Sequence, residues 1–359
     1  MRPIPRRATS ALGGVIAAAL LATAACALVM ALGDRGGVVL EALGASLLTP
    51  FGLGYSLFYT TPILLTGLSV AVCFHAGLFN IGAEGQLYLG AAAVVAVSHL
   101  VPTDSAWLGI PLGIAAAAAA GAAWAALAAW LKVRRGSHEV IVTILLNFVA
   151  IALVNWLILY PLDDPFSQAT ESMPVASGYH LARLDTLCSL VGLRCFADTP
   201  VNLTLFGALA LAVGLHALLL RSVWGYEVRV AGTEEAAARF AGIRVGVRLI
   251  GAMALGGALA GLVGVNEVMG YHHSLVEGFS PGYGFTGIAV ALLAKNRPGR
   301  IVAAALLFGV MQNSARELEF LSEHVTKELS LVLQALVVAW VAAGSCPRPA
   351  WFRKVLHRA

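Results

Sequence analysis

Three polar side chains stand between apolar stretches in the segment FNIGAEGQLYLG, residues 79–90. Asn80, Glu84 and Gln86 supply amide and carboxylate groups, and the glycines around them let a helix break and its neighbours approach closely. In an apolar surrounding, such groups either satisfy the backbone donors and acceptors that a break exposes or contact a polar solute. We expect backbone bracing as the main role, with Glu84 accepting from backbone amides. Direct contact with a solute is the alternative.

A second glycine-rich segment, VEGFSPGYGFTG at residues 276–287, also precedes an apolar run, and it carries Ser280 and Phe285. Both segments predict interrupted helices. Other polar side chains lie inside apolar runs, where lipid does not solvate them, so we expect them to face the protein interior or a water-filled path. These side chains are Asn147, Asn266 and Glu267.

The sequence offers no catalytic constellation. A G-x-S-x-G match at residues 278–282 lies between apolar runs, and not on the strand–turn–helix elbow that this motif requires. His138 and Glu139 begin an H-E-x-x-H pattern, but Val142 stands where the second histidine would be. No lysine follows a glycine, which excludes a G-x-x-x-x-G-K phosphate loop. We therefore predict a protein that is not an enzyme, that holds no metal or cofactor, and whose ATP, if any, is bound by a separate subunit.

Long apolar runs must position these side chains. Hydrophobic residues make up 59% of the 359 residues and charged residues only 12%, against about 25% charged residues in soluble domains. Runs of roughly 20 apolar residues cross a bilayer as helices, because lipid leaves no water for exposed backbone groups. The sequence predicts one all-α integral membrane domain over residues 1–359, with eight to ten spans and ten favoured. The runs are Ala11–Leu32, Pro62–Leu78, Gln86–Val101, Ala106–Leu131, Val140–Tyr160, Leu203–Leu220, Leu249–Val265, Phe285–Ala294, Ile301–Met311 and Leu329–Ala343.

Positive charges orient these spans. If the N-terminus and the C-terminus are both cytoplasmic, most of the 23 Lys and Arg lie on cytoplasmic segments, as the positive-inside rule requires. The same orientation makes residues 161–200 an external loop and residues 221–248 a cytoplasmic coupling loop. The net charge of +4 then reflects orientation and does not indicate nucleic-acid binding. The exceptions to the rule are Arg35, Arg183, Arg194, Arg316 and Lys327.

Ten spans divide into two halves of five with opposite orientations in the membrane. The two glycine-rich segments then occupy matching places, one after the second span and one after the seventh. Inverted repeats with interrupted helices in matching places are typical of transport pathways. Two ordinary turns are the alternative, since the halves share little sequence identity.

The cytoplasmic loop contains a short helix-forming sequence. A threonine N-cap, two glutamates near the positive end, alanines and a closing glycine predict a helix over residues 233–241. Two helical turns are marginal alone, so we expect a partner ATPase to hold them, with a solvated loop helix as the alternative. The residues assigned to this coupling role are Thr233, Glu234, Glu235, Ala236, Ala237, Arg239 and Gly242.

Cys188 and Cys195 lie seven residues apart in the predicted external loop. An oxidising periplasm would allow a disulfide between them. The spacing leaves the bridged and the unbridged form open.

Four blocks of sequence, in this order, resemble the permease subunit of bacterial ABC importers of the ribose and branched-chain amino-acid class, nearest to its nucleoside or simple-sugar branch. The resemblance covers nearly the whole chain except the N-terminal helix and the 161–200 loop. It implies import of a small polar solute by a multi-pass protein of the bacterial inner membrane. The blocks are FNIGAEGQLYLGA (79–91), SHEVIVTILLNFVAIALVNWLI (137–158), GYEVRVAGTEEAAARFAGI (225–243) and GYGFTGIAVALLAKNRPGRIVAAALLFGVM (282–311).

The resemblance also implies partners other than membrane lipid. These are a cytoplasmic tandem-domain ATPase subunit, a second permease subunit (a paralogue or a second copy) and an extracytoplasmic substrate-binding lipoprotein. It assigns residues 233–241 to contact with the ATPase and the break at Glu84 to the permeation path. The alternative function is an ion-coupled secondary transporter, with Glu84 or Glu267 as coupling group. Such a transporter needs no helix that docks an ATPase.

Overall fold

The structure, a computed structural model, describes residues 37–190, 192 and 196–321. Residues 46–313 form one compact unit, called here the main unit, and the described residues 37–45 and 314–321 belong to another. The described residues contain helices and isolated β-bridges but no strand, so the all-α prediction is confirmed for them. The helices are α2 (Gly37–Leu48), α3 (Pro50–His75), α4 (Ala83–Leu100), α5 (Ala106–Arg135), α6 (Glu139–Leu159), the 3-10 helix η1 (Ser177–Tyr179), α7 (Leu184–Leu190), α8 (Thr204–Arg221), α9 (Val223–Thr233), α10 (Glu235–Phe240), α11 (Val245–Gly261), the π-helix η2 (Val265–His272), α12 (Tyr283–Leu293) and α13 (Pro298–Leu321).

Five helices in the described part of the chain are long and apolar enough to cross a membrane. They are α3, α5, α6, α8 and the continuous segment Val245–His272, which joins α11 to η2. Every predicted apolar run within the described ranges overlaps a helix. The runs Ala11–Leu32 and Leu329–Ala343 and both chain termini lie outside those ranges. The count of ten spans, the cytoplasmic termini and the inverted repeat therefore stay predictions.

Helix α3 begins at Pro50, so the predicted start of this span at Pro62 was wrong. Thr49 caps the helix, because its hydroxyl accepts a hydrogen bond from the Gly52 N–H at 2.9 Å. Pro50 occupies the first turn, where its missing N–H leaves no helical bond unmade. Pro62 lies inside the 26-residue helix, where a sequence pattern alone favours a break.

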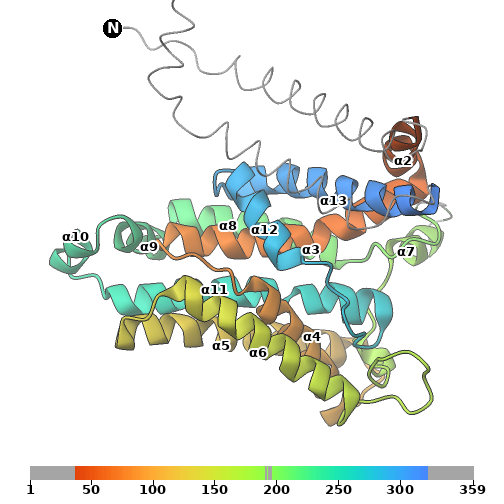
Figure 1. Ribbon diagram of the computed structural model, residues 1–359, viewed down its shortest axis with the longest axis horizontal. Coiled ribbons are helices and arrows are strands. Elements are labelled where there is room, and N and C mark those ends of the chain that lie inside the picture. Colours follow the sequence, from red (N-terminus) through yellow and green to blue (C-terminus); the bar gives the residue numbers. More distant parts are fainter. Residues whose placement is uncertain (1–36, 191, 193–195, 322–359) are drawn as a thin grey trace, which may run out of the picture. The chain divides into compact units, whose positions relative to one another are not determined.

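The two ends of the main unit carry different elements. Figure 1 shows α9 and α10 at one end, and α7 with the loop that follows α6 at the opposite end. The described parts of the predicted cytoplasmic loop (221–248) and of the predicted external loop (161–200) thus lie at opposite ends of the helices, and which end faces the cytoplasm stays a prediction.

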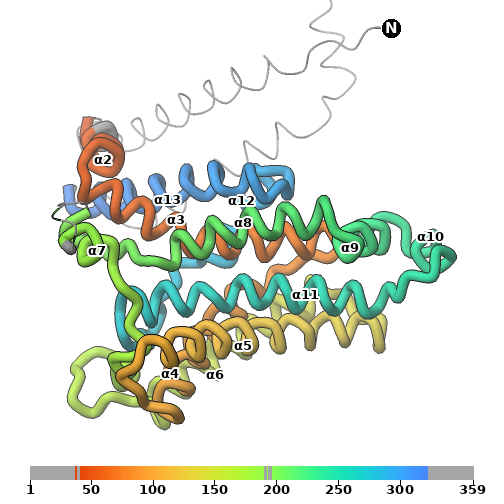
Figure 2. Tube along the Cα trace, turned by 180° about the vertical axis from the view of Figure 1, so that it is seen from behind, coloured from red at the N-terminus to blue at the C-terminus, as the bar shows by residue number. Residues whose placement is uncertain are grey.

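Helices α5 and α11 run side by side along the main unit (Figures 1 and 2). Glycines make their contact close: a Cβ atom at Gly257 would overlap the carbonyl oxygen of Gly121, and one at Gly261 would overlap that of Ala117. Such close backbone approach provides the packing that joins helices in lipid, where the hydrophobic effect does not draw them together. The Gly257-x-x-x-Gly261 pattern, predicted to permit close packing, lies in this contact.

Gly257→Ala tests the contact between α5 and α11. The added methyl group overlaps Gly121, and overpacking of this kind costs about 1–3 kcal/mol. Gly214→Ala on α8 is the matched control, because a Cβ atom there meets no neighbouring group within 4 Å. Thermal unfolding in detergent should show a lower melting temperature for Gly257→Ala alone. A melting temperature equal to that of the wild type would contradict the contact.

Candidate functional site

The first helix break lies between α3 and α4, and hydrogen bonds of its two amide side chains hold it together. Asn80 and Gln86 exchange two hydrogen bonds of 2.9 Å, and Asn80 Nδ2 also lies 3.2 Å from Ser69 Oγ. Asn80 Oδ1 accepts from the backbone N–H of Gly82 at 3.1 Å. Both amide side chains are buried. Asn80 and Gln86 therefore brace the turn, and their polar atoms are largely engaged with each other.

Asn147 on α6 completes the first break. Its Oδ1 accepts from the backbone N–H of Gly85, and its Nδ2 donates to the carbonyl of Ile81, both at 2.8 Å. One side chain thus satisfies a donor and an acceptor of the interrupted segment. The sequence predicted that Asn147 faces the protein interior or a water-filled path; in the structure it is buried, and both of its partners lie in the first break.

The second break meets the first across 200 residues of sequence. Glu84 Oε2 accepts a hydrogen bond of 2.7 Å from the backbone N–H of Gly284, in the first turn of α12. The Ser280 hydroxyl accepts from the N–H groups of Gly282 and Tyr283 in the same turn. A Cβ atom at Gly284 would overlap the Glu84 backbone, so glycine permits the approach. Glu84 has the backbone-amide partner that the sequence led us to expect, and Ser280 lies beside it in the second break.

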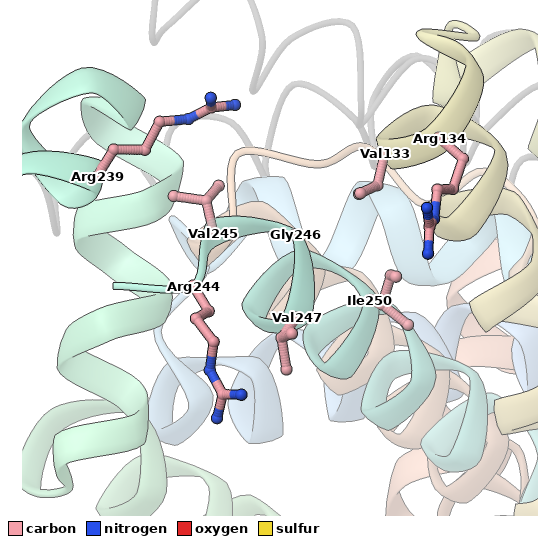
Figure 3. A pocket seen from close by; sticks show the side chains of 8 residues that line it. All are labelled: Val133, Arg134, Arg239, Arg244, Val245, Gly246, Val247 and Ile250. Atoms are coloured by element: carbon pink, nitrogen blue, oxygen red, sulfur yellow. The ribbon is translucent and has the colours of Figure 1, made fainter. Parts of the chain in front are cut away.

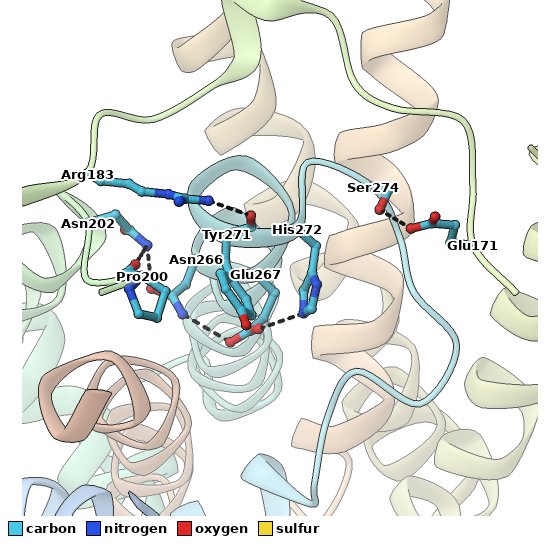
Figure 4. Close-up of polar contacts among 9 residues, drawn as sticks. All are labelled: Glu171, Arg183, Pro200, Asn202, Asn266, Glu267, Tyr271, His272 and Ser274. Atoms are coloured by element: carbon cyan, nitrogen blue, oxygen red, sulfur yellow. Dashed lines mark hydrogen bonds and ion pairs between the residues drawn. The ribbon is translucent and has the colours of Figure 1, made fainter. Parts of the chain in front are cut away.

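The π-helix η2 carries a second buried carboxylate. Glu267 is 2% exposed, and its Oε1 accepts from Asn266 Nδ2 at 3.0 Å. The His272 ring lies 3.9 Å from the other carboxylate oxygen, as Figure 4 shows. Asn202 Nδ2 reaches Asn266 Oδ1 at 3.2 Å. Sequence reasoning missed Asn202, whose only signal is an amide directly before an apolar run.

Tyr283, in the first turn of α12, lies near the two buried carboxylates. Its side chain is 3% exposed and within electrostatic range of both carboxylates and of two further tyrosines. These four residues are Glu84, Glu267, Tyr59 and Tyr271. The two breaks and η2 therefore form one polar centre among the helices. Phe285, which the sequence placed with this group, is 53% exposed on α12 and takes part in none of the polar contacts described for the centre.

The predicted coupling helix is shorter than expected. Thr233 is the last residue of α9, and its hydroxyl donates to the Arg229 carbonyl at 2.6 Å, so the predicted N-cap at Thr233 was wrong. The reason is that α9 continues through Thr233, and α10 follows only after Glu234, whose backbone is extended. Gly242 has a φ of +78° just after the end of α10, as predicted for a closing glycine.

Helix α10 presents exposed side chains at its end of the main unit. Ala238 is buried against Ala231 and Val245, which anchors the helix. Ala237 faces outward, and Phe240 is 94% exposed. The sequence did not single out Phe240, because an apolar residue in a six-residue helix gives no periodicity that distinguishes an inward from an outward face.

An open groove of about 440 Å³ lies beside α10. Figure 3 shows Val133 and Arg134, from the end of α5, across the groove from Arg239 on α10. Aliphatic and guanidinium groups together suit a partner segment that is partly apolar and acidic. The lining residues are Val133, Arg134, Arg239, Arg244, Val245, Gly246, Val247 and Ile250.

Of the two cysteines considered as a pair, Cys188 lies in α7. Cys195 lies outside the described residues. The disulfide between them stays a prediction.

Comparison with known proteins gives one family and several relatives. The family model described as branched-chain amino acid transport system / permease component matches residues 52–342. The chain is 35% identical to the glucose ABC transporter permease protein TsgB13 of Haloferax volcanii, over 85% of this chain and 83% of that protein. It is 33% identical to the guanosine ABC transporter permease protein NupP of Bacillus subtilis, over 81% of each chain. It is 30% identical to the nucleoside ABC transporter permease protein NupB of Lactococcus lactis, over 81% and 79%.

Asn147→Leu tests the bracing of the first break. The substitution leaves the Gly85 N–H and the Ile81 carbonyl without their partner, and an unsatisfied buried group costs about 1–3 kcal/mol. Asn155→Leu on the same helix is the matched control, since the Asn155 side-chain oxygen accepts no hydrogen bond within the described residues. Size-exclusion chromatography in detergent should show a reduced folded yield for Asn147→Leu and a normal yield for Asn155→Leu. A normal folded yield for both variants would show that Asn147 is not needed to brace the break.

Proposed function

The chain belongs to the permease-component family of branched-chain amino acid transport systems and is a permease subunit of an ABC importer; from this premise we propose that it carries a nucleoside inward across the bacterial inner membrane. The relatives named for guanosine and for nucleosides support this cargo. A simple sugar is the second candidate, because the relative at 35% identity is named for glucose.

The joined helix breaks are the observation that carries the proposal. Interrupted helices in transporters line the path of the solute. Here Glu84, Glu267 and Tyr283 put carboxylate and hydroxyl groups at the centre of the helices, where the hydroxyls of a ribose or a sugar find partners. Asn80 and Gln86 bond mainly to each other, so the centre holds a passing solute weakly. Weak contacts suit an importer whose separate binding protein selects the cargo.

A cytoplasmic ATPase with two tandem domains supplies the energy in this proposal, since the chain has no phosphate loop. Helix α10 and the groove beside it form the docking surface for that subunit. Glu234, Glu235 and Arg239 give the surface charge, and the outward face at Ala236 and Ala237 lets a partner approach closely. A short helix of this kind transmits the motion of the ATPase through the fit of its surface. An added bulky side chain should therefore impair transport more than the loss of one charge.

Two further partners complete the proposed transporter. A second permease subunit, a paralogue or a second copy, forms the other half of the path. An extracytoplasmic substrate-binding lipoprotein delivers the solute to the end that carries α7. The position of the two loops at opposite ends of the helices supports this arrangement (Figure 1).

The ion-coupled alternative would use Glu84 or Glu267 as the coupling group. Glu84 is engaged by the Gly284 N–H and Glu267 by Asn266, which supports structural roles for both. Membership of an ABC permease family further argues against ion coupling.

Uptake by reconstituted vesicles tests the proposed function. Vesicles that contain both permease subunits and the ATPase, with the binding protein outside, should accumulate labelled guanosine when ATP is enclosed. They should not accumulate it when a proton gradient replaces ATP. ATP-driven uptake of glucose without guanosine would establish the second cargo. Uptake driven by the gradient alone would overturn the proposal.

The same vesicles test the coupling surface. Ala237→Trp adds a bulky ring to the exposed face of α10 and should abolish most ATP-driven uptake. Ala119→Trp, at an exposed position of α5 away from the groove, is the matched control and should leave uptake near normal. Normal uptake by the Ala237→Trp complex would show that α10 does not transmit the ATPase motion.

A further inference from the structure

The loop that follows α6 is a folded element with an aromatic side chain at its tip. Residues 162–173, called here the external hairpin, run out and back: the Asp164 N–H donates to the Glu171 carbonyl, and the Met173 N–H donates to the Leu162 carbonyl. The tip is fixed as well, because Asp164 Oδ1 accepts from the Phe166 N–H at 3.0 Å. Phe166 is 95% exposed. An ordered backbone thus holds a large apolar side chain entirely in solvent.

The charge of the external hairpin argues against burial of Phe166 in lipid. Residues 161–182 contain three carboxylates and no lysine or arginine. Hydrogen bonds from the Ser167 and Ser274 hydroxyls hold the pKa of Glu171 below its usual range, so it is ionised at neutral pH. Anionic lipid headgroups repel such a surface. The three carboxylates are Asp163, Asp164 and Glu171.

Other aromatic residues already occupy the predicted membrane interface. Trp156 and Tyr160 are exposed at the last turn of α6, and Trp107 is 94% exposed in the first turn of α5, beside the exposed Leu108. These positions are typical of the aromatic belt of a membrane protein. Phe166 lies beyond the end of α6, in the loop that Figure 1 shows extending past that helix.

The hairpin is attached to the second helix break. Its return segment pairs with residues 273–277, since the Ser172 N–H donates to the Leu275 carbonyl at 3.0 Å and the Val175 N–H to the His273 carbonyl at 2.8 Å. The bond from Ser274 Oγ to Glu171 Oε2, drawn in Figure 4, adds a side-chain tie. Residues 273–277 lead directly into the break. These bonds connect the hairpin to the chain segment that precedes Gly284, the partner of Glu84.

We propose that Phe166 and the carboxylates around it are the surface on which the extracytoplasmic binding protein docks. This inference rests on the proposed function, which supplies such a partner. The matching surface on the binding protein is an apolar pocket for one aromatic ring, bordered by lysine or arginine. Exposed aromatic anchors in a charged rim carry much of the energy of protein interfaces, and the rim charges set orientation and rate. A second copy of this chain does not fit, because two acidic hairpins repel each other.

The test measures the dissociation constant between the guanosine-loaded binding protein encoded with this permease and the full transporter in nanodiscs. Phe166→Ala should weaken binding by about 30-fold or more, the loss expected for an aromatic anchor. Trp107→Ala removes an equally exposed aromatic ring from the same end and should leave the dissociation constant unchanged. Asp164→Asn keeps the acceptor for the Phe166 N–H but removes the charge, so it should weaken binding less and reduce its dependence on salt.

Each outcome bears on one claim. An unchanged dissociation constant for Phe166→Ala, or no measurable binding to the wild-type transporter, overturns the docking site. Equal losses for Phe166→Ala and Trp107→Ala would show that the loss is not specific to Phe166 and would likewise overturn it. Failure of ATP-driven uptake, with Phe166-dependent binding intact, refutes the proposed import and leaves the docking site standing. Thermal unfolding of each variant, equal to that of the wild type, excludes misfolding as the cause of weaker binding.

Discussion

The hydrogen bond from the Gly284 N–H to the Glu84 carboxylate joins two interrupted helices, and the polar centre depends on it. The amides in the first turn of a helix have no partner within that helix, and a bilayer provides no water to replace one. A typical hydrogen bond contributes about 0.5–1.5 kcal/mol, and a buried donor left without a partner costs about 1–3 kcal/mol. A single carboxylate on α4 therefore fixes where α12 begins and how closely it approaches the first break.

Most of the other polar side chains serve the same need. Asn147 bonds to the Ile81 carbonyl and the Gly85 N–H of the first break. Asn80 and Gln86 bond to each other, and the Ser280 hydroxyl accepts from the Tyr283 N–H in the first turn of α12. Because these side chains already have partners within the protein, few polar groups are left to bind a solute. Such a path binds the solute weakly and lets it pass. This agrees with an importer in which another subunit selects the cargo. Glycines permit the close approach at these contacts, because a Cβ atom at Gly85 would overlap Asn147 and one at Gly284 would overlap Glu84.

The sequence predicted the features that follow from local composition. Apolar runs located the helices, and clusters of glycines located both breaks, with amides in the first segment and Ser280 in the second, because lipid restricts where such residues are tolerated. Contacts distant in sequence were not predictable: no pattern indicates that Glu84 meets Gly284 or that Asn202 meets Asn266. The N-cap at Thr233 was wrong because propensity did not reveal that α9 continues through that residue. Phe166 gave no signal either, since exposure depends on how the hairpin folds.

Amide hydrogen exchange at Gly284 is the most direct measure of the central bond. In the assembled wild-type transporter we expect this amide to exchange as slowly as those in the middle of α12, although it lies in the first turn, where fraying otherwise permits fast exchange. In Glu84→Leu it should exchange much faster, while the amides in the middle of α12 keep their protection. Equal exchange at Gly284 in the two proteins would contradict the view that Glu84 joins the two breaks.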